Sequence, residues 1–514
     1  MRLGLVALGL LAGLLTVVAL EMALRLLGIG GGVPRYDPFA GFSRTVPMFE
    51  PVTLADGTPG FRTAAARRLK VPQEFPASKP PGSFRVFVVG ESSAAGVPYS
   101  VWYAFSTFLE QRLRAQLPEL QVQVVNAAVS GYASRRILAV VEELARYQPD
   151  LLIVYAGHNE LGERRYYAHL VEMDPRLFRL WEWLAQTRLY AVASQMPIIG
   201  VKHEPPRFDF RDLENSFQMF AVLSRNALGA YPTAREVAWG EEHYRLNVEK
   251  MVEAMQAVGV PVMLVTLGQD FADWAPGVSV HRPDLTEQDR RAFDDLVAQG
   301  DRLAPTDCPG AIAAYRRALL VDDAYADLHY RIATCERRSG KFAAARDAYR
   351  RASDLDRVPH GAPSSYNDVL RDIARRYGTM LADADRMFEQ ASPDGLVGQS
   401  LFVDFVHPNV HGHVLLARFL AEEMRRAGLP VPGDRWRDGY VDPEPADLYA
   451  RDPGLRTQEL IGRASACLLA RRPACAQEAT DAVLALDPGN PHGRQLAAGI
   501  KKWNEQVAQR RRVP

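Results

Sequence analysis

Short, mostly apolar runs alternate along the chain with longer stretches whose apolar residues recur at helical spacing. We predict strands at 85–89, 122–125, 151–155, 261–266 and 379–382, and helices at 104–117, 134–147, 241–257 and 413–426. This alternation predicts an α/β fold with a parallel sheet that is covered by helices on both faces. Functional sites in such folds lie beyond the carboxyl ends of the strands.

An uncharged apolar run of 18 residues, Leu3 to Leu20, lies near the start of the chain. It is just long enough to cross a hydrocarbon core as a helix. A cleavable signal peptide is the alternative, but its apolar core is usually shorter and ends in small residues. Because the run continues into Glu21 and Arg25, we predict residues 1–27 as an uncleaved, single-pass membrane anchor. We expect the rest of the chain to lie in the periplasm or outside the cell.

Two segments interrupt the α/β domain, which we predict to occupy residues 84–283 and 359–430. Residues 161–233 are rich in aromatic side chains and directly follow the third strand. We expect most of these rings to pack between helices and some to line the site. Residues 28–83, before the domain, are rich in Gly and Pro, and we predict a linker with little structure.

The second interruption, residues 284–358, carries an internal repeat. Residues Ala311, Tyr315 and Ala318 recur 34 positions later, and so does Asp322; the second copies are Ala345, Tyr349, Ala352 and Asp356. The pattern resembles the tetratricopeptide repeat, in which small residues let paired helices approach closely. One full repeat, 326–357, and the second helix of another are visible. Because at least three repeats are normally needed, we expect a further helix pair in the C-terminal extension, 431–514.

Composition changes this picture little. The chain has 514 residues, with 61 basic and 61 acidic side chains, so charge does not favour a nucleic-acid partner. The four cysteines form no zinc-binding spacing. Buried free thiols are the simpler interpretation, and an exported chain could instead join them in any of three pairings.

Candidate catalytic residues follow the first three predicted strands, and two more form a pair further along the chain. Ser92 follows the first strand, Gly131 lies shortly after the second, and Asn159 follows the third. Asp404 and His407 stand three residues apart. A serine nucleophile needs a base with an orienting carboxylate, and its oxyanion needs hydrogen-bond donors. We predict Ser92, His407 and Asp404 as a catalytic triad, with an oxyanion hole of the Ser92 and Gly131 backbone N–H groups and the Asn159 amide.

These residues carry a resemblance to a known family. The sequence resembles the four blocks of the SGNH (GDSL-type) hydrolases, in the order Gly90-Glu91-Ser92, Asn126 with Gly131, Gly157-His158-Asn159, and Asp404-Phe405-Val406-His407. The resemblance implies a flavodoxin-like three-layer α/β/α fold and ester hydrolysis or acyl transfer with no metal or other cofactor. Glu91 and Glu160 replace the usual aspartates, which keeps both carboxylates and indicates a subfamily.

Single residues of this set also allow other interpretations. Ser93 competes with Ser92 as nucleophile, but the first block places Ser92 in that role. His407, His411 and His413 together suggest a metal site, since His407 and His411 lie four residues apart, a spacing that suits metal ligation on a helix. Pro408 disfavours a helix through both, and we expect no metal.

The sequence therefore favours a membrane-anchored serine esterase acting on an acyl or acetyl ester, carried by a glycan of the cell envelope or by a lipid. An O-acyltransferase that passes the acyl group to a polysaccharide hydroxyl would use the same site. A third interpretation is a scaffold in which the helical repeats bind a protein partner and the hydrolase body is secondary.

Overall fold

A five-stranded parallel sheet forms the centre of the computed structural model, which describes residues 2–30, 41–42, 46–67, 71–193, 232–357, 361–470 and 472–511. The strand order is β5-β4-β6-β7-β8. The strands are β4 (Ser83–Gly90), β5 (Gln121–Asn126), β6 (Leu151–Tyr155), β7 (Val262–Val265) and β8 (Met380–Ala382). All five predicted strands are present, and all neighbouring pairs are parallel.

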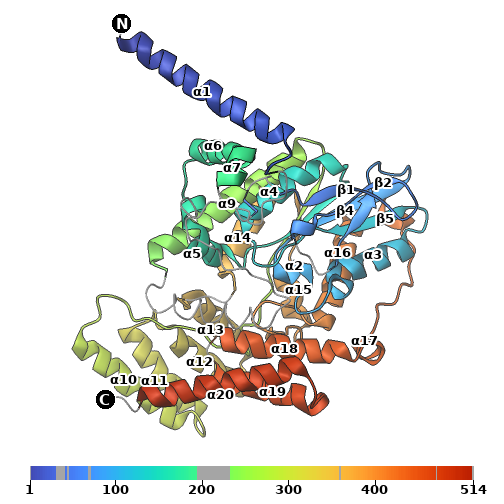
Figure 1. Cartoon of the computed structure of the whole chain (residues 1–514). Coiled ribbons are helices and arrows are strands. Elements are labelled where there is room, and N and C mark those ends of the chain that lie inside the picture. Colours follow the sequence, from blue (N-terminus) through green and yellow to red (C-terminus); the bar gives the residue numbers. More distant parts are fainter. Residues whose placement is uncertain are drawn as a thin grey trace.

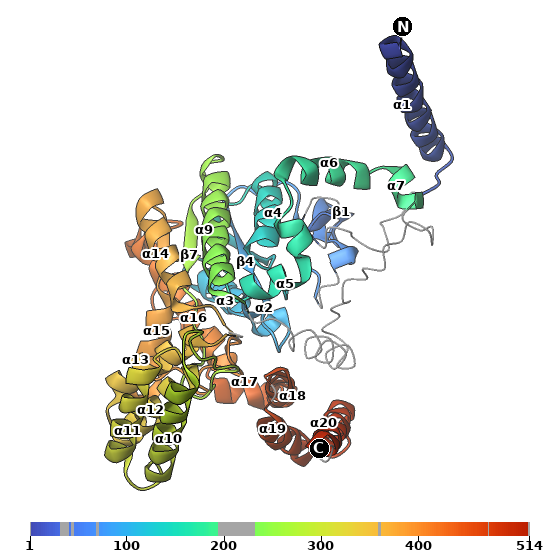
Figure 2. The ribbon, with the colours of Figure 1, turned by 90° about the vertical axis from the view of Figure 1, so that its left-hand side faces the viewer.

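Helices cover both faces of this sheet (Figure 1; Figure 2). Helices α3 (Phe105–Gln116) and α16 (Val410–Arg426) pack together on one face. The other face carries α4 (Ser134–Leu144), α9 (Ala234–Gln256) and α14 (Ser364–Tyr377). Shorter elements are α2 (Ser92–Ala95), α15 (Ala384–Ala391), α17 (Pro445–Arg451) and 3-10 turns at Ala65–Arg67, Val101–Tyr103, Ala145–Tyr147, Pro393–Gly395 and Gly433–Arg435. The predicted α/β fold with a parallel sheet is confirmed.

The segment before the first parallel strand is more ordered than we predicted. Its described part forms a second, antiparallel sheet of β1 (Phe49–Thr53), β2 (Pro59–Thr63) and β3 (Glu74–Pro76). Phe49 and Phe75 are buried against Phe87 of β4 and Tyr147. The Gly and Pro residues in the described part of this segment lie largely at turns and strand ends, so the prediction of little structure was wrong there.

The repeat-bearing insertion folds as two helical hairpins. They are α10 (Glu287–Leu303) with α11 (Cys308–Val321), and α12 (Ala326–Arg338) with α13 (Phe342–Leu355). The repeated alanines and tyrosines of α11 and α13 are buried at equivalent positions. The repeated Asp322 and Asp356 both hold one segment of the body: Asp356 accepts from the N–H groups of Gly277 and Val278, and Asp322 pairs with His281.

Helix α1 (Arg2–Leu26) projects from the body (Figure 1; Figure 2). Within the part of the chain that the structure describes, no helix combines the length and the hydropathy needed to cross a bilayer. The predicted spanning helix is therefore not found there. The aromatic segment supplies α5 (Glu160–Val171), α6 (Pro175–Ala185) and α7 (Arg188–Ala193); its residues 194–231 lie outside the described residues.

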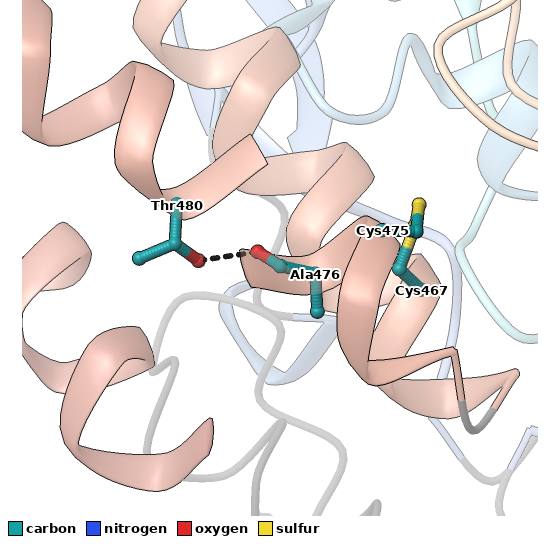
Figure 3. The surroundings of a disulfide bond; sticks show 4 residues. All are labelled: Cys467, Cys475, Ala476 and Thr480. Carbon is teal, nitrogen blue, oxygen red and sulfur yellow. Dashed lines mark hydrogen bonds between the residues drawn. A yellow bond between two sulfur atoms is a disulfide. The ribbon is translucent and has the colours of Figure 1, made fainter. Parts of the chain in front are cut away.

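The C-terminal extension adds three helices, α18 (Gly454–Leu469), α19 (Pro473–Leu486) and α20 (Pro491–Arg511). A disulfide between Cys467 and Cys475 joins α18 to α19 (Figure 3). Cys308 and Cys335 are buried free thiols. The expectation of free thiols thus holds for one pair of cysteines and fails for the other.

Candidate active site

The nucleophile block and the third block are joined by a buried carboxylate. Ser92 begins α2 directly after β4, and Glu91 lies between the strand and the helix with no exposed surface. The Glu91 Oε1 atom accepts hydrogen bonds from the backbone N–H groups of Gly157 and His158, at 2.7 and 2.5 Å. Burial raises the pKa of Glu91 to about 7. The longer side chain that replaces the usual aspartate therefore ties the end of β4 to the end of β6.

Strands β4 and β6 approach each other closely at the same point. A Cβ atom on Gly90 would lie 2.2 Å from the carbonyl oxygen of Tyr155 in β6. Only glycine fits this contact without a shift of the backbone. The close approach sets the distance between Ser92 and the loop that carries Asn159.

The downstream pair lies on the loop that precedes α16. The Asp404 carboxylate accepts from the backbone N–H groups of Val406 and His407, at 3.0 and 2.9 Å. It also pairs with the Nδ1 atom of His407 at 2.7 Å. Burial alone would raise the pKa of Asp404, but His407 and the backbone donors hold it below its usual value. Asp404 is therefore an ionised, fully partnered carboxylate that fixes the imidazole.

Folding brings this pair to the nucleophile block, which lies far earlier in the sequence. The Nε2 atom of His407 lies 2.8 Å from the Oγ atom of Ser92, across a separation of 315 residues. Since Nδ1 donates its hydrogen to Asp404, Nε2 is left as the acceptor for the Ser92 hydroxyl. The three side chains thus form one hydrogen-bonded chain.

Gly131 and Asn159 lie on loops at the same edge of the sheet as Ser92. They follow β5 and β6, the two strands on either side of β4. Gly131 has a φ of +78°, a conformation that L side chains rarely adopt. Asn159 Nδ2 donates to the Tyr132 carbonyl at 3.1 Å, and its amide has a second hydrogen to offer. Asn126, at the start of the second block, supports the site by donating to the Ala94 carbonyl and the Ser106 hydroxyl, both at 2.8 Å.

Ser93, the alternative nucleophile, and His413, a candidate metal ligand, both have other contacts. The Ser93 hydroxyl is buried and donates to the Val406 carbonyl at 3.0 Å. It therefore holds the loop from Asp404 to His407, the histidine loop, against α2. His413 is fully buried, and its Nδ1 atom accepts from the backbone N–H of Phe105 at 3.3 Å. His411 is exposed on α16. The three histidines that suggested a metal site therefore do not converge.

No pattern in the sequence indicated the contacts that hold the histidine loop from behind. The Asp270 N–H donates to the Phe405 carbonyl at 2.9 Å, and the Phe405 ring packs on Trp274, with 5.2 Å between the ring centroids. Trp274 belongs to a core built mainly from α18, α19 and α20. Tyr330 of α12 donates to the Ala272 carbonyl at 3.0 Å. The two helical additions, which are the repeat-bearing insertion and the C-terminal helices α18 to α20, therefore both support the histidine loop.

In the described part of the aromatic segment, three rings pack against one another and not against Ser92 or His407. Phe178, Trp181 and Tyr190 form one cluster with Leu170, and the Trp181 indole donates to the Tyr190 hydroxyl at 3.3 Å. The interpretation as ordinary helical packing fits these rings.

Comparison with known proteins supports an ester-bond hydrolase. The GDSL-like Lipase/Acylhydrolase family matches residues 88–331. The matched span contains Ser92, Gly131 and Asn159 and ends before Asp404 and His407. No protein with a curated description matches the chain.

Solved structures with partial likeness include the acetylxylan esterase Axe2 of Geobacillus stearothermophilus, at 14% identity and a TM-score of 0.32, covering 67% of this chain and 95% of that one. TesA matches at 13% identity and a TM-score of 0.28, covering 66% and 98%. The likeness at these TM-scores decides nothing about the substrate.

Proposed function

We propose that this ester-bond hydrolase is a serine esterase with Ser92 as its nucleophile. One observation carries the proposal: the His407 imidazole lies between the Ser92 hydroxyl, 2.8 Å from Nε2, and the Asp404 carboxylate, 2.7 Å from Nδ1. This is the arrangement that a neutral hydroxyl needs to attack an acyl carbon.

In the proposed reaction, the Ser92 Oγ atom attacks the acyl carbon while His407 Nε2 takes the hydroxyl proton. Asp404 keeps the proton on Nδ1 and stabilises the imidazolium. Collapse of the tetrahedral intermediate breaks the ester C–O bond, and the leaving alkoxide takes the proton from Nε2. Water then attacks the acyl-enzyme by the same route, which releases the carboxylic acid and restores Ser92.

We propose the backbone N–H groups of Ser92 and Gly131 and the Asn159 amide as the oxyanion donors. Their positions at the ends of β4, β5 and β6 support this assignment. One such donor typically contributes about 3 kcal/mol to lowering the barrier. Asn159→Ala should therefore lower kcat by about a hundredfold.

The test of the nucleophile and the base is hydrolysis of p-nitrophenyl acetate under pre-steady-state conditions. The wild type should release a burst of nitrophenol as Ser92 is acylated, and Ser92→Ala should release none. His407→Ala should lose turnover to a similar degree, whereas the matched control His411→Ala, on the exposed surface of α16, should keep it. Full turnover by Ser92→Ala would refute the proposal.

We propose an acyl or acetyl ester of a cell-envelope glycan as the substrate and water as the acceptor. The family match supports an ester substrate, and the same acyl-enzyme would serve an O-acyltransferase. Product analysis with an acetyl donor, in the presence and absence of a deacetylated glycan, separates the two. Acetate as the sole product in both samples supports hydrolysis, and acetylated glycan supports transfer.

We propose that the body lies outside the cytosol and is attached to the membrane through its N-terminal helix. The Cys467–Cys475 disulfide supports this location, since disulfides persist in oxidising compartments. Protease added to intact spheroplasts should degrade the body, and its full protection would contradict the proposal.

We further propose that the hairpins α10–α11 and α12–α13 are tetratricopeptide-like repeats whose role is to support the catalytic loop. The shared use of Asp322 and Asp356 to hold residues 277–281 favours this role over a free scaffold. Asp356→Asn should lower kcat and slow the labelling of Ser92 by a fluorophosphonate, because a displaced His407 activates the hydroxyl less well, and unchanged kcat would argue against it.

A further inference from the structure

Exposed large apolar side chains gather on one side of the molecule. One group lies on α1 and just beyond it, from Leu11 to Ile29. The second lies on α6 and consists of Leu177, Leu180, Trp183 and Leu184, which are 41% to 62% exposed. Elsewhere in the described residues such side chains are scattered singly: Trp102, Leu246, Val258, Val280, Leu320, Val441 and Leu486. Scattered residues need no explanation, whereas a contiguous patch indicates an interaction surface.

Helix α6 is fixed to the body by its opposite face. Phe178 and Ala185 are buried in the cluster with Leu170, and the Arg135 guanidinium lies over the Phe178 ring. At 100° per residue, Leu177, Leu180 and Leu184 fall on one side of the helix, away from Phe178. The exposed leucines therefore do not result from a loose helix, because the same helix is anchored on its other side.

Helix α6 is joined to the base of α1 through α7, which contacts both helices. The Glu21 carboxylate of α1 accepts from the backbone N–H groups of Arg188 and Leu189, at 3.1 and 3.0 Å, at the start of α7. Figure 2 shows α7 between the base of α1 and α6, and in both figures α1 projects from that side of the body (Figure 1; Figure 2). The two apolar groups are thus held in a defined arrangement.

We propose that the exposed face of α6 rests at the boundary between headgroups and acyl chains of an anionic lipid bilayer, near the base of α1, with its apolar side chains in the outer acyl region. Helix α1 exposes apolar side chains on all sides, for example Leu14, Leu15 and Leu20, which favours an apolar surrounding medium over a single protein groove. On α6, the exposed Arg176 and Arg179 flank the leucines, and their guanidinium groups complement lipid phosphates. An apolar face with Trp and flanking Arg is typical of helices that lie in a membrane surface.

This contact is separate from the attachment through α1 and from the proposed catalysis. It would hold the body in one orientation on the membrane instead of leaving it to rotate about the end of α1. The contact is therefore tested by the depth of α6 in the bilayer and not by whether the chain binds membranes at all.

The experiment uses the full chain in vesicles of phosphatidylethanolamine and phosphatidylglycerol that carry brominated acyl chains. Trp183 and Trp102 are matched probes because they are 62% and 61% exposed, and bromine quenches only a tryptophan that reaches the acyl region. The quenched part of the fluorescence should fall in Trp183→Phe and stay unchanged in Trp102→Phe. Equal quenching in both variants and the wild type would overturn the proposal.

A second pair of variants tests the leucine face itself. Leu177→Glu with Leu180→Glu should abolish the quenching of Trp183, whereas Leu320→Glu, on α11 and 86% exposed, should not change it. Thermal melting and p-nitrophenyl acetate turnover should be the same in all of these proteins, since the replaced side chains are exposed. If the double variant instead converts a dimer to a monomer and leaves the quenching intact, α6 binds a second copy of the chain and the bilayer proposal fails.

Discussion

Replacing Asp404 by asparagine tests the proposed catalytic chain at its orienting carboxylate. In the wild type this carboxylate accepts from two backbone N–H groups and from His407 Nδ1. The amide oxygen of the variant side chain could still accept from the backbone, but its NH₂ group would then face Nδ1. The imidazole would have to carry its hydrogen on Nε2, which would donate to Ser92 instead of accepting the hydroxyl proton.

The wrong tautomer should lower kcat about 10⁴-fold, which corresponds to about 5 kcal/mol in the activation barrier. The assay is steady-state hydrolysis of p-nitrophenyl acetate, with Asp438→Asn as control because that side chain is 82% exposed. Circular dichroism should show the same fold in both variants. Asp404→Asn activity within about tenfold of the wild type would refute the assignment of Asp404.

The same substitution should change the dependence of stability on pH. The pKa of Asp404 is lower in the folded protein than its usual value. A carboxyl group with a lowered folded pKa contributes stability above its unfolded pKa, near 3.9, and this contribution is lost as the pH falls through the folded pKa. The difference in unfolding free energy between wild type and Asp404→Asn should therefore shrink as the pH drops below about 4, as urea titrations would show.

Three further predictions concern neighbouring features. The pKa of Glu91 is raised from 4.5 to about 7, so its ionisation destabilises the fold as the pH rises through that interval; Glu91→Gln should flatten the pH dependence of the melting temperature between those values. Gly131→Ala places a side chain at a φ of +78° and should destabilise the fold by about 1–2 kcal/mol in urea titration, with a larger loss of kcat. Cys467→Ser opens a disulfide with a sequence separation of 8 and should lower stability by about 2.5 kcal/mol, while the wild type under reducing conditions should melt like the variant.

The alternation of apolar runs predicted the central sheet because buried parallel strands leave a signal that is short, strong and local. The sheet before β4 was missed because its apolar residues are spread over three short strands. Asp56-Gly57 lies between β1 and β2, and such a dipeptide between strands indicates a hairpin. In the same way, α9 begins at Ala234, earlier than predicted, behind a capping box of Thr233 and Glu236, a sequence signature of helix starts.

Part of the site could likewise be predicted from the sequence and part could not. The residues after β4, β5 and β6 follow from strand order, since the carboxyl ends of parallel strands meet at one edge of a sheet. No local pattern indicates that Asp404 and His407 reach Ser92, and that prediction depended on the family resemblance. The sequence also could not predict that Ser93 holds the histidine loop, because this role depends on a contact with Val406, 313 residues away.

The histidine loop is held from three directions by parts of the chain that are far apart in sequence. The nucleophile helix holds it through the Ser93 hydroxyl and the Val406 carbonyl. The segment after β7 holds it through the Asp270 N–H and the Phe405 carbonyl. The C-terminal helices hold it through Trp274, which packs in their core and against the Phe405 ring. A displacement of about 1 Å at a catalytic group can lower the rate about a hundredfold. The helical additions therefore affect the position of His407 relative to Ser92, as the sheet does. The proposed catalytic unit is therefore the α/β body together with these helices, and the sheet alone would leave His407 without this support.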